Sequence, residues 1–132
     1  MQSIKVLIID EEPEFTGVLA DRLRSWGFLA MEAHGRDEAL ENQKTFFPKV
    51  AVISVRGKES KALPLMNQLR ANDSGLRVIL LLGKGAAIAG IRGMEQGAAD
   101  CIPLPLDLGV LIDSIRLVTG SNHSIAIDET DP

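Results

Sequence analysis

Two kinds of segment alternate along the whole chain, and this alternation is the feature that most constrains its fold. Short runs of aliphatic and β-branched residues are separated by longer segments whose apolar residues recur at helical spacing. The short runs lie at residues 5–10, 29–33, 50–55, 77–82 and 101–104. The helical segments lie at residues 13–26, 37–46, 60–71, 86–96 and 107–118. The alternation predicts five βα units in one domain, which suits a length of 132 residues.

Three of the predicted strands, at residues 5–10, 50–55 and 77–82, are almost continuously apolar. Such strands lie in the middle of a parallel sheet, where helices cover both faces. Right-handed crossovers then give a doubly wound α/β sheet between two layers of helices. In such sheets, chemistry collects at the carboxyl ends of the strands, near the point where the strand order reverses. We expect this domain to span residues 1–119, followed by a polar tail or linker at residues 120–132.

The charge and the composition of the chain argue against several classes of function. Its 14 Lys and Arg residues and 18 Asp and Glu residues are interspersed, with a formal charge of −4, so we expect no nucleic acid partner. The longest apolar runs are too short to cross a bilayer and no secretory leader is recognisable, so we expect a cytoplasmic domain without a membrane contact. The single cysteine, Cys101, cannot form an internal disulfide, and no His or Cys cluster has zinc-ligand spacing.

Three consecutive carboxylates, Asp10, Glu11 and Glu12, follow the first predicted strand and directly precede a helix. Adjacent acids at a strand end suit a hard, oxygen-seeking cation such as Mg²⁺. Acids at this position also complement the dipole of the following helix and accept hydrogen bonds from its free amides. The triplet alone leaves both interpretations open.

Several phrases of the sequence together resemble the receiver domain of two-component response regulators. The phrases are VLIIDEEPEF, FFPKVAVISVRG, VILLLGKG and GAADCIPLPLDLGVLIDSI, and the resemblance spans residues 4–118. It implies a flavodoxin-like fold, with five parallel strands in the order 2-1-3-4-5 and five helices in three α/β/α layers. It also implies phosphorelay signalling, in which a histidine kinase phosphorylates an aspartate at the end of the third strand. In that family two acids after the first strand bind Mg²⁺, and a hydroxyl and a lysine at the next two strand ends contact the phosphoryl group.

At the positions that match these roles, the chain departs from the family pattern. The matching positions are Asp10 and Glu11 for the acidic pair, Ser54 for the phosphoacceptor, Leu82 for the hydroxyl and Leu104 for the lysine. Cys101 stands where the family usually carries an aromatic residue that moves on activation. Three of the five active-site positions have therefore lost the side chain that the family uses.

These departures predict that ordinary phosphorelay chemistry fails. A serine hydroxyl is a poor nucleophile without an adjacent base, and the nearest acids have reference pKa values of about 4. We expect Leu82 and Leu104 to leave the phosphoryl charge unbalanced and to crowd the space of a hydrated Mg²⁺. We therefore expect no catalytic residue, no enzymatic activity and no cofactor, with Asp10 and Glu11 as weak metal candidates. For Ser54 we expect a structural hydroxyl.

The surface of the fourth helix, fifth strand and fifth helix is the predicted route of signalling. In LGVLIDSIRLV, Val110 and Leu117 fall opposite the sheet-facing side of the helix and form an outward apolar pair. The small residues of the fourth helix, which we assign to the same surface, are Ala86, Ala89, Gly90 and Gly93. Close packing of this helix on the sheet would favour small residues as well.

The leading hypothesis is a degenerate receiver that acts as a phosphorylation-independent protein interaction module. Its partner would be a second copy, another protein, or a linked output or kinase domain. The first alternative is a phosphoacceptor that still switches, using Ser54 or a displaced acid. The second is a phosphate or nucleotide site where Gly83 and Gly85 precede a helix, although the spacing matches neither common phosphate-loop motif.

Overall fold

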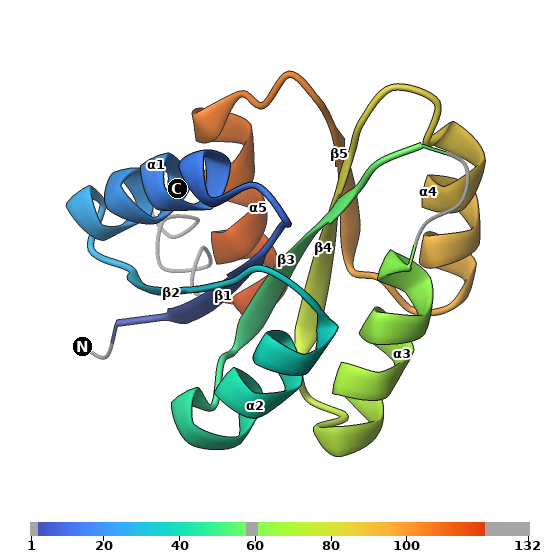
Figure 1. The fold of residues 1–132 in the computed structure, drawn as a ribbon. Coiled ribbons are helices and arrows are strands. Elements are labelled where there is room, and N and C mark those ends of the chain that lie inside the picture. The colour runs from blue at the N-terminus through green and yellow to red at the C-terminus, as the bar shows by residue number, and fades with distance from the viewer. Residues whose placement is uncertain (1–2, 58–60, 121–132) are drawn as a thin grey trace, which may run out of the picture.

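A parallel sheet forms the central layer of the molecule. The computed structural model describes residues 3–57 and 61–120. The strands in these ranges are β1 (Lys5–Ile9), β2 (Leu29–Ala33), β3 (Val50–Val55), β4 (Arg77–Leu82) and β5 (Asp100–Pro103). They pair in the order β2-β1-β3-β4-β5, which confirms the predicted fold (Figure 1).

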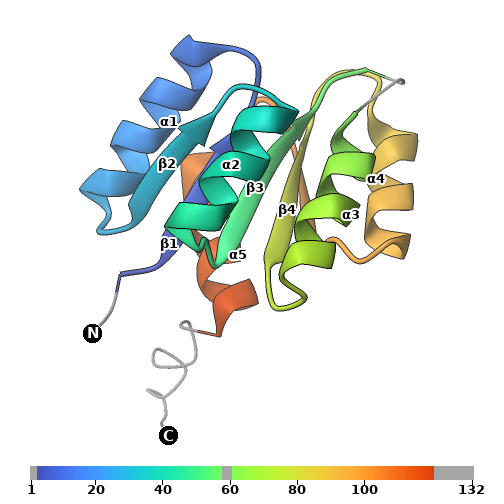
Figure 2. The same cartoon turned by 60° about the horizontal axis from the view of Figure 1, so that its bottom comes forward.

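The helices of the described ranges divide between the two faces of this sheet. They are α1 (Pro13–Ser25), α2 (Arg36–Phe46), α3 (Ala62–Asn72), α4 (Ala87–Glu95) and α5 (Leu108–Thr119). Helices α1 and α5 pack on one face, and α2, α3 and α4 pack on the other (Figure 1, Figure 2). The result is the predicted three-layer α/β/α arrangement.

The continuous apolar character of the central strands follows from this double covering. On β1, Val6 and Ile8 point into the core beneath α1 and α5, whereas Leu7 and Ile9 point into the core on the opposite face. Successive side chains of a strand alternate between faces, so a strand covered on both sides needs an apolar residue at every position. All four side chains are buried.

Every helix and strand begins and ends within two residues of its predicted range. Pro13 opens α1, where its missing N–H costs nothing because the first turn of a helix leaves that group unpaired. The Asp107 side chain accepts a hydrogen bond of 3.2 Å from the N–H of Val110 and caps α5. Of the predicted tail, residues 121–132 lie outside the described residues. No helix in the described ranges is long and apolar enough to cross a membrane.

The small residues of α4 face the sheet, so their assignment to an interaction surface is wrong. Ala86, Ala89, Gly90 and Gly93 are all buried. A Cβ atom on Gly90 would lie 2.5 Å from Cδ1 of Leu82, and one on Gly93 would collide with Leu80. Leucine side chains of β4 already fill the space under the helix. Close packing on the sheet is therefore the reason for the small residues.

The exposed side of α4 carries larger apolar residues instead. Ile88, Ile91 and Met94 are exposed there, and Ile91 exposes 62% of its surface. On α5, Val110 and Leu117 lie on the outward face that their spacing predicted, with Leu117 67% exposed. Because α4 and α5 pack on opposite faces of the sheet beside β5, these exposed residues flank the edge strand from two sides.

Candidate functional site

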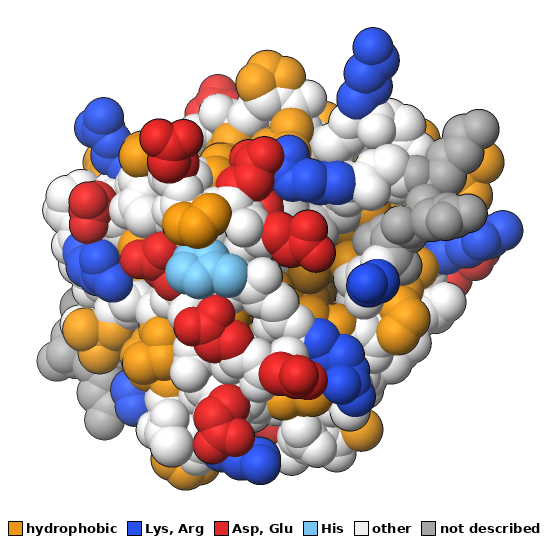
Figure 3. Space-filling model, viewed as in Figure 1, with side chains coloured by type: hydrophobic (Ala, Val, Ile, Leu, Met, Phe, Trp, Pro, Cys, Tyr) orange, Lys and Arg blue, Asp and Glu red, His pale blue; other side chains and the backbone are white. Residues whose placement is uncertain are grey.

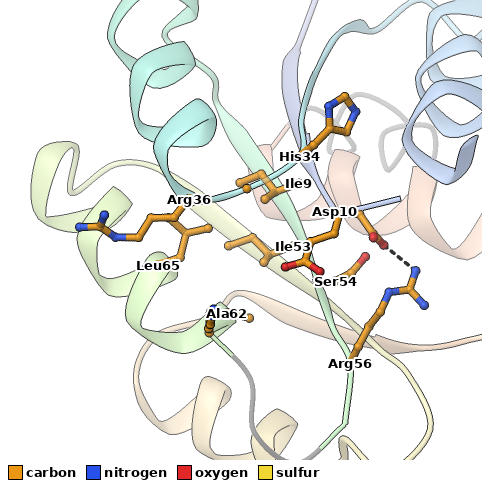
Figure 4. Close-up of a pocket in the computed structure, with 12 residues that line it drawn as sticks. Ile9, Asp10, His34, Arg36, Ile53, Ser54, Arg56, Ala62 and Leu65 are labelled. Carbon is orange, nitrogen blue, oxygen red and sulfur yellow. Dashed lines mark hydrogen bonds and ion pairs between the residues drawn. The ribbon is translucent and has the colours of Figure 1, made fainter. Parts of the chain in front are cut away.

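A pocket of about 240 Å³ opens at the carboxyl ends of β1 and β3, where the strand order reverses. The loop after β2 and the first turns of α2 and α3 complete it (Figure 4). Its lining residues are Ile9, Asp10, Glu11, His34, Gly35, Arg36, Ile53, Ser54, Arg56, Lys61, Ala62 and Leu65. The structure thus brings three of the five predicted site residues together, namely Asp10, Glu11 and Ser54.

The carboxylate of Asp10 lies at the base of the site and is almost completely buried, with 1% of the side chain exposed. Its Oδ1 accepts a hydrogen bond of 3.0 Å from the backbone N–H of Glu12. Its Oδ2 accepts one of 2.6 Å from Nη2 of Arg56. Both oxygens of this buried carboxylate therefore already have donors from the chain itself.

Arg56 is a site residue that the sequence interpretation missed. It follows β3 directly, and its guanidinium also lies 3.5 Å from Oε1 of Glu12 and 5.8 Å from the ring centroid of Phe15. Figure 4 shows Arg56 reaching toward Asp10, whereas Arg36 points away from it. The available signal was a basic residue two positions after Ser54, at the same edge of the sheet as three consecutive carboxylates.

Hydrogen bonding decides the charge state of this pair. Burial alone would raise the pKa of Asp10, but hydrogen bonds from Arg56, from the Ser54 hydroxyl and from the N–H of Glu12 hold that pKa below its usual value. The hydrogen bond to Asp10 in turn raises the pKa of the Arg56 guanidinium. Asp10 is therefore ionised and Arg56 protonated at neutral pH.

The residues of this site do not fit the Mg²⁺ ion that the family resemblance implies. Mg²⁺ requires oxygen ligands at about 2.0–2.1 Å in octahedral geometry. A guanidinium nitrogen at 2.6 Å from Oδ2 of Asp10 lies where an ion bound to that oxygen would have to be. Within residues 3–57 and 61–120, no group of three or more His, Cys, Asp or Glu side chains could hold a metal ion.

Leu82 and Leu104 do not line the pocket, so the expectation that they crowd a metal site is wrong. Leu82 points toward α4, where it packs against Gly90. Leu104 packs into the core on the other face of the sheet, beneath α1 and α5. Each leucine therefore extends the apolar core of one face instead of filling the space beside Asp10.

Cys101, at the position of the family's aromatic residue, is partly buried against α4. Its Sγ lies 3.5 Å from the carbonyl oxygen of Gly90. Burial and then the nearby charge of Asp100 raise the pKa of the thiol, so it stays protonated at neutral pH.

The amide of Gly83, directly after β4, is engaged with the backbone rather than open to a ligand. The N–H of Gly83 donates a hydrogen bond of 2.8 Å to the carbonyl of Val55. A Cβ on Gly83 would lie 3.2 Å from that carbonyl oxygen, so glycine allows the close approach. Because this amide is occupied, the geometry weighs against the part of the phosphate or nucleotide hypothesis that uses Gly83.

His34, at the rim of the pocket, links α1, β2 and α2. Its Nε2 lies 2.9 Å from Oγ1 of the buried Thr16 and 3.4 Å from Oε1 of Glu32. Its Nδ1 lies 3.3 Å from Oε1 of Glu38. Acidic side chains gather on this face of the molecule (Figure 3), and Glu32 and Glu38 are the two that contact His34.

The comparisons with known proteins agree with this architecture. Residues 6–116 match the family model of the response regulator receiver domain. The chain is 27% identical over 127 residues to the probable transcriptional regulatory protein TcrX of Mycobacterium tuberculosis, which covers 96% of this chain and 54% of that protein. It is 26% identical over 119 residues to the transcriptional regulatory protein CpxR of Escherichia coli K12, covering 90% of this chain and 50% of that protein. The chain thus spans about half the length of these relatives.

Two solved structures illustrate the similarity in fold. A CheY-like receiver domain protein from Methanospirillum hungatei JF-1 superposes with a TM-score of 0.82 at 16% identity, covering 93% of this chain and 98% of that one. The FixJ-N crystal structure superposes with a TM-score of 0.80 at 24% identity, covering 91% and 96%.

Proposed function

The chain belongs to the response regulator receiver family, and we propose that it is a degenerate receiver of two-component signalling that binds protein partners without phosphorylation. The observation that carries this proposal is the state of the receiver pocket. Ser54 stands at the phosphoacceptor position, and its hydroxyl donates to Asp10, whose oxygens also accept from Arg56 and Glu12. The carboxylate of Asp10 is thus already paired with groups of the chain itself.

The same contacts argue against Ser54 as a nucleophile. A serine needs a neighbouring base to remove its proton. Asp10 is the carboxylate that Ser54 contacts, and its lowered pKa makes it a weaker base than an ordinary aspartate. Leu82 and Leu104 also supply neither the hydroxyl nor the ammonium that family members use around the phosphoryl group. The alternative of a phosphoacceptor that still switches has no observation in its favour.

The exposed apolar residues beside β5 support the interaction part of the proposal. Single exposed aliphatic residues are common, but α4 presents Ile88, Ile91 and Met94 along one side, and α5 adds Val110 and Leu117. Edge strand β5 has only four residues and ends at Pro103, which limits pairing with a strand of another chain. A partner, either a second copy or another protein, is therefore expected to dock on the helices.

Phosphorylation is tested by incubating the protein with Mg²⁺ and acetyl phosphate and measuring the intact mass. We expect no phosphoryl adduct, and we expect Mg²⁺ with beryllofluoride to leave the melting temperature unchanged. A receiver that carries the phosphoacceptor aspartate serves as the positive control. An adduct on Ser54 would overturn the proposal and favour the switching alternative.

The docking surface is tested by light scattering of the wild type, Ile91→Asp and Leu117→Asp. If the protein forms homodimers through this surface, both variants have a lower average mass. Val18→Asp is the matched control, because Val18 is an exposed aliphatic residue on α1, away from β5. A monomeric wild type removes homodimerisation and leaves a different protein as the partner.

A further inference from the structure

Arg56 lies among the carboxylates of the loop between β1 and α1. Its Nη2 is 2.6 Å from Oδ2 of Asp10 and 3.5 Å from Oε1 of Glu12, and Glu11 is close enough to add to the attraction. Three acids at one strand end repel one another unless a positive charge lies between them. In the described structure that charge is provided by the guanidinium.

The Asp10–Arg56 pair differs from an ordinary surface ion pair. The Asp10 side chain is 1% exposed and the Arg56 side chain 47% exposed, so the acid is buried and the base covers it from the solvent side. Exposed ion pairs contribute little, but removal of one partner from a buried charge leaves that charge uncompensated at a high cost. Asp10 therefore requires a cation at this place.

The chain holds Arg56 in position from two sides. The guanidinium lies 5.8 Å from the ring centroid of Phe15 on α1, within the range of a cation–π contact. A Cβ on Gly83 would lie 3.8 Å from Cα and 3.9 Å from Cγ of Arg56, so the loop after β4 runs directly beside the arginine. Phe15 thus lies beside the guanidinium, and the loop after β4 passes close to the stem of Arg56.

We propose that Arg56 is a tethered cation that replaces the divalent metal of a receiver pocket and excludes metal ions from Asp10. The guanidinium offsets one of the three negative charges of the acidic loop at all times, so Asp10 has a cation beside it without a divalent ion. Removal of the positive charge should let a divalent cation approach Asp10 and Glu12, the two carboxylates that the guanidinium now contacts. The inference goes beyond the proposed function, because it holds whether or not Ser54 is ever modified.

The experiment compares Mn²⁺ binding to the wild type, Arg56→Met and Arg56→Lys, measured by electron paramagnetic resonance. Methionine keeps an apolar stem beside Phe15 but has no charge, whereas lysine keeps a cation. We expect no saturable binding to the wild type, and binding to Arg56→Met that is stronger by at least about tenfold, since one unit charge near the ion has been removed. Arg56→Lys should resemble the wild type.

Two controls assign the effect to the site. Arg22→Met removes an exposed arginine from α1 and changes the net charge equally, so it should bind no more Mn²⁺ than the wild type. Adding Asp10→Asn to Arg56→Met should abolish the gain. Circular dichroism checks that each variant folds. If Arg56→Met does not fold, Arg56→Gln replaces it, because glutamine is also uncharged but can donate a hydrogen bond to Asp10.

Saturable Mn²⁺ binding to the wild type, or equal binding by the wild type and a folded, uncharged Arg56 variant, would overturn the inference. These results are distinguishable from a failure of the proposed function. A phosphoryl adduct on Ser54 of a wild type that binds no Mn²⁺ would refute the proposed function and leave the role of Arg56 intact.

Discussion

Leu82 on β4 fills the space that a side chain on Gly90 of α4 would need, since its Cδ1 lies 2.5 Å from the ideal Cβ position. The side chain at the family's hydroxyl position is thus part of the helix-to-sheet packing. Substitutions at these two residues should therefore depend on each other.

Gly90→Ala should lower the free energy of unfolding by about 1 kcal/mol or more. Overpacking costs about 1–3 kcal/mol, which exceeds the gain of about 0.5–1 kcal/mol from replacing a helical glycine by alanine. In a Leu82→Ala background the collision is gone, so the same substitution should be neutral or stabilising. Urea denaturation of the four proteins gives the coupling energy.

Gly17→Ala provides the matched control for this cycle. Gly17 is also within a helix, but the nearest atom to a Cβ there is Oε1 of Glu32 at an ordinary 3.9 Å. This substitution should therefore stabilise the protein by about 0.5–1 kcal/mol. An equal cost of Gly90→Ala with and without Leu82 would contradict the packing relationship.

The sequence predicts the sheet well because each central strand is almost continuously apolar, which only a doubly covered strand requires. It predicts the orientation of α4 poorly. The sequence interpretation assigns Gly90 and Gly93 to an exposed interaction surface, although close packing on the sheet would favour small residues as well. The structure reverses this because leucines of β4 already fill the volume beneath the helix.

The candidate site, like the fold, could be predicted from the sequence only in part. Asp10, Glu11 and Ser54 could be placed together because the carboxyl ends of neighbouring parallel strands meet at one edge. The contact of Arg56 with Asp10 could not be predicted, because it depends on the path of a long, flexible side chain. Arg36 also lines this pocket, but it turns away and bonds Gln68.

Stability should depend on pH through Asp10. Because the folded pKa of Asp10 is lowered, its contribution is fully present above the unfolded value of about 4 and is lost as the pH falls through the folded pKa. The difference in free energy of unfolding between wild type and Asp10→Asn should be constant near neutral pH and shrink below about pH 4. Urea denaturation across this range measures it, and a difference that grows on acidification would contradict the prediction.

Removal of Arg56 should move this acid transition. The hydrogen bond from Arg56 is the largest of the contacts that lower the pKa of Asp10, whereas burial raises that pKa. In Arg56→Met the folded pKa should therefore rise toward the unfolded value, so less stability should be lost on acidification than in the wild type. Identical acid transitions in the two proteins would show that Arg56 does not control the charge of Asp10.

Cys101 should react slowly with thiol reagents in the native state. Burial and then the charge of Asp100 raise the pKa of the thiol, so the reactive thiolate is scarce at pH values where a free cysteine is partly ionised. At about pH 8 we expect reaction with iodoacetamide at least about tenfold slower than in urea-unfolded protein. Equal rates would mean that the sulfur is neither buried nor protonated as described.

Gly97→Ala should be among the most destabilising glycine substitutions in the described part of the chain. Gly97 has a φ of +113°, where side chains are strained, and a Cβ there would collide with the Arg70 guanidinium. Nε of Arg70 is buried without a hydrogen-bond partner among the described residues, so the packing around the side chain, and not a hydrogen bond to Nε, limits how far the guanidinium can shift. Gly27→Ala is the matched control, since Gly27 has a φ of +93° but no atom within 4 Å of the new Cβ.

Both substitutions add backbone strain of about 1–2 kcal/mol, and only Gly97→Ala adds the collision. The free energy of unfolding, measured by urea denaturation, should therefore fall further for Gly97→Ala than for Gly27→Ala. Arg70→Ala should remove the extra loss, because it deletes the group that the new methyl would strike. If the two glycine substitutions cost the same, or if Arg70→Ala restores nothing, Arg70 is free to move away and does not fix the turn between α4 and β5.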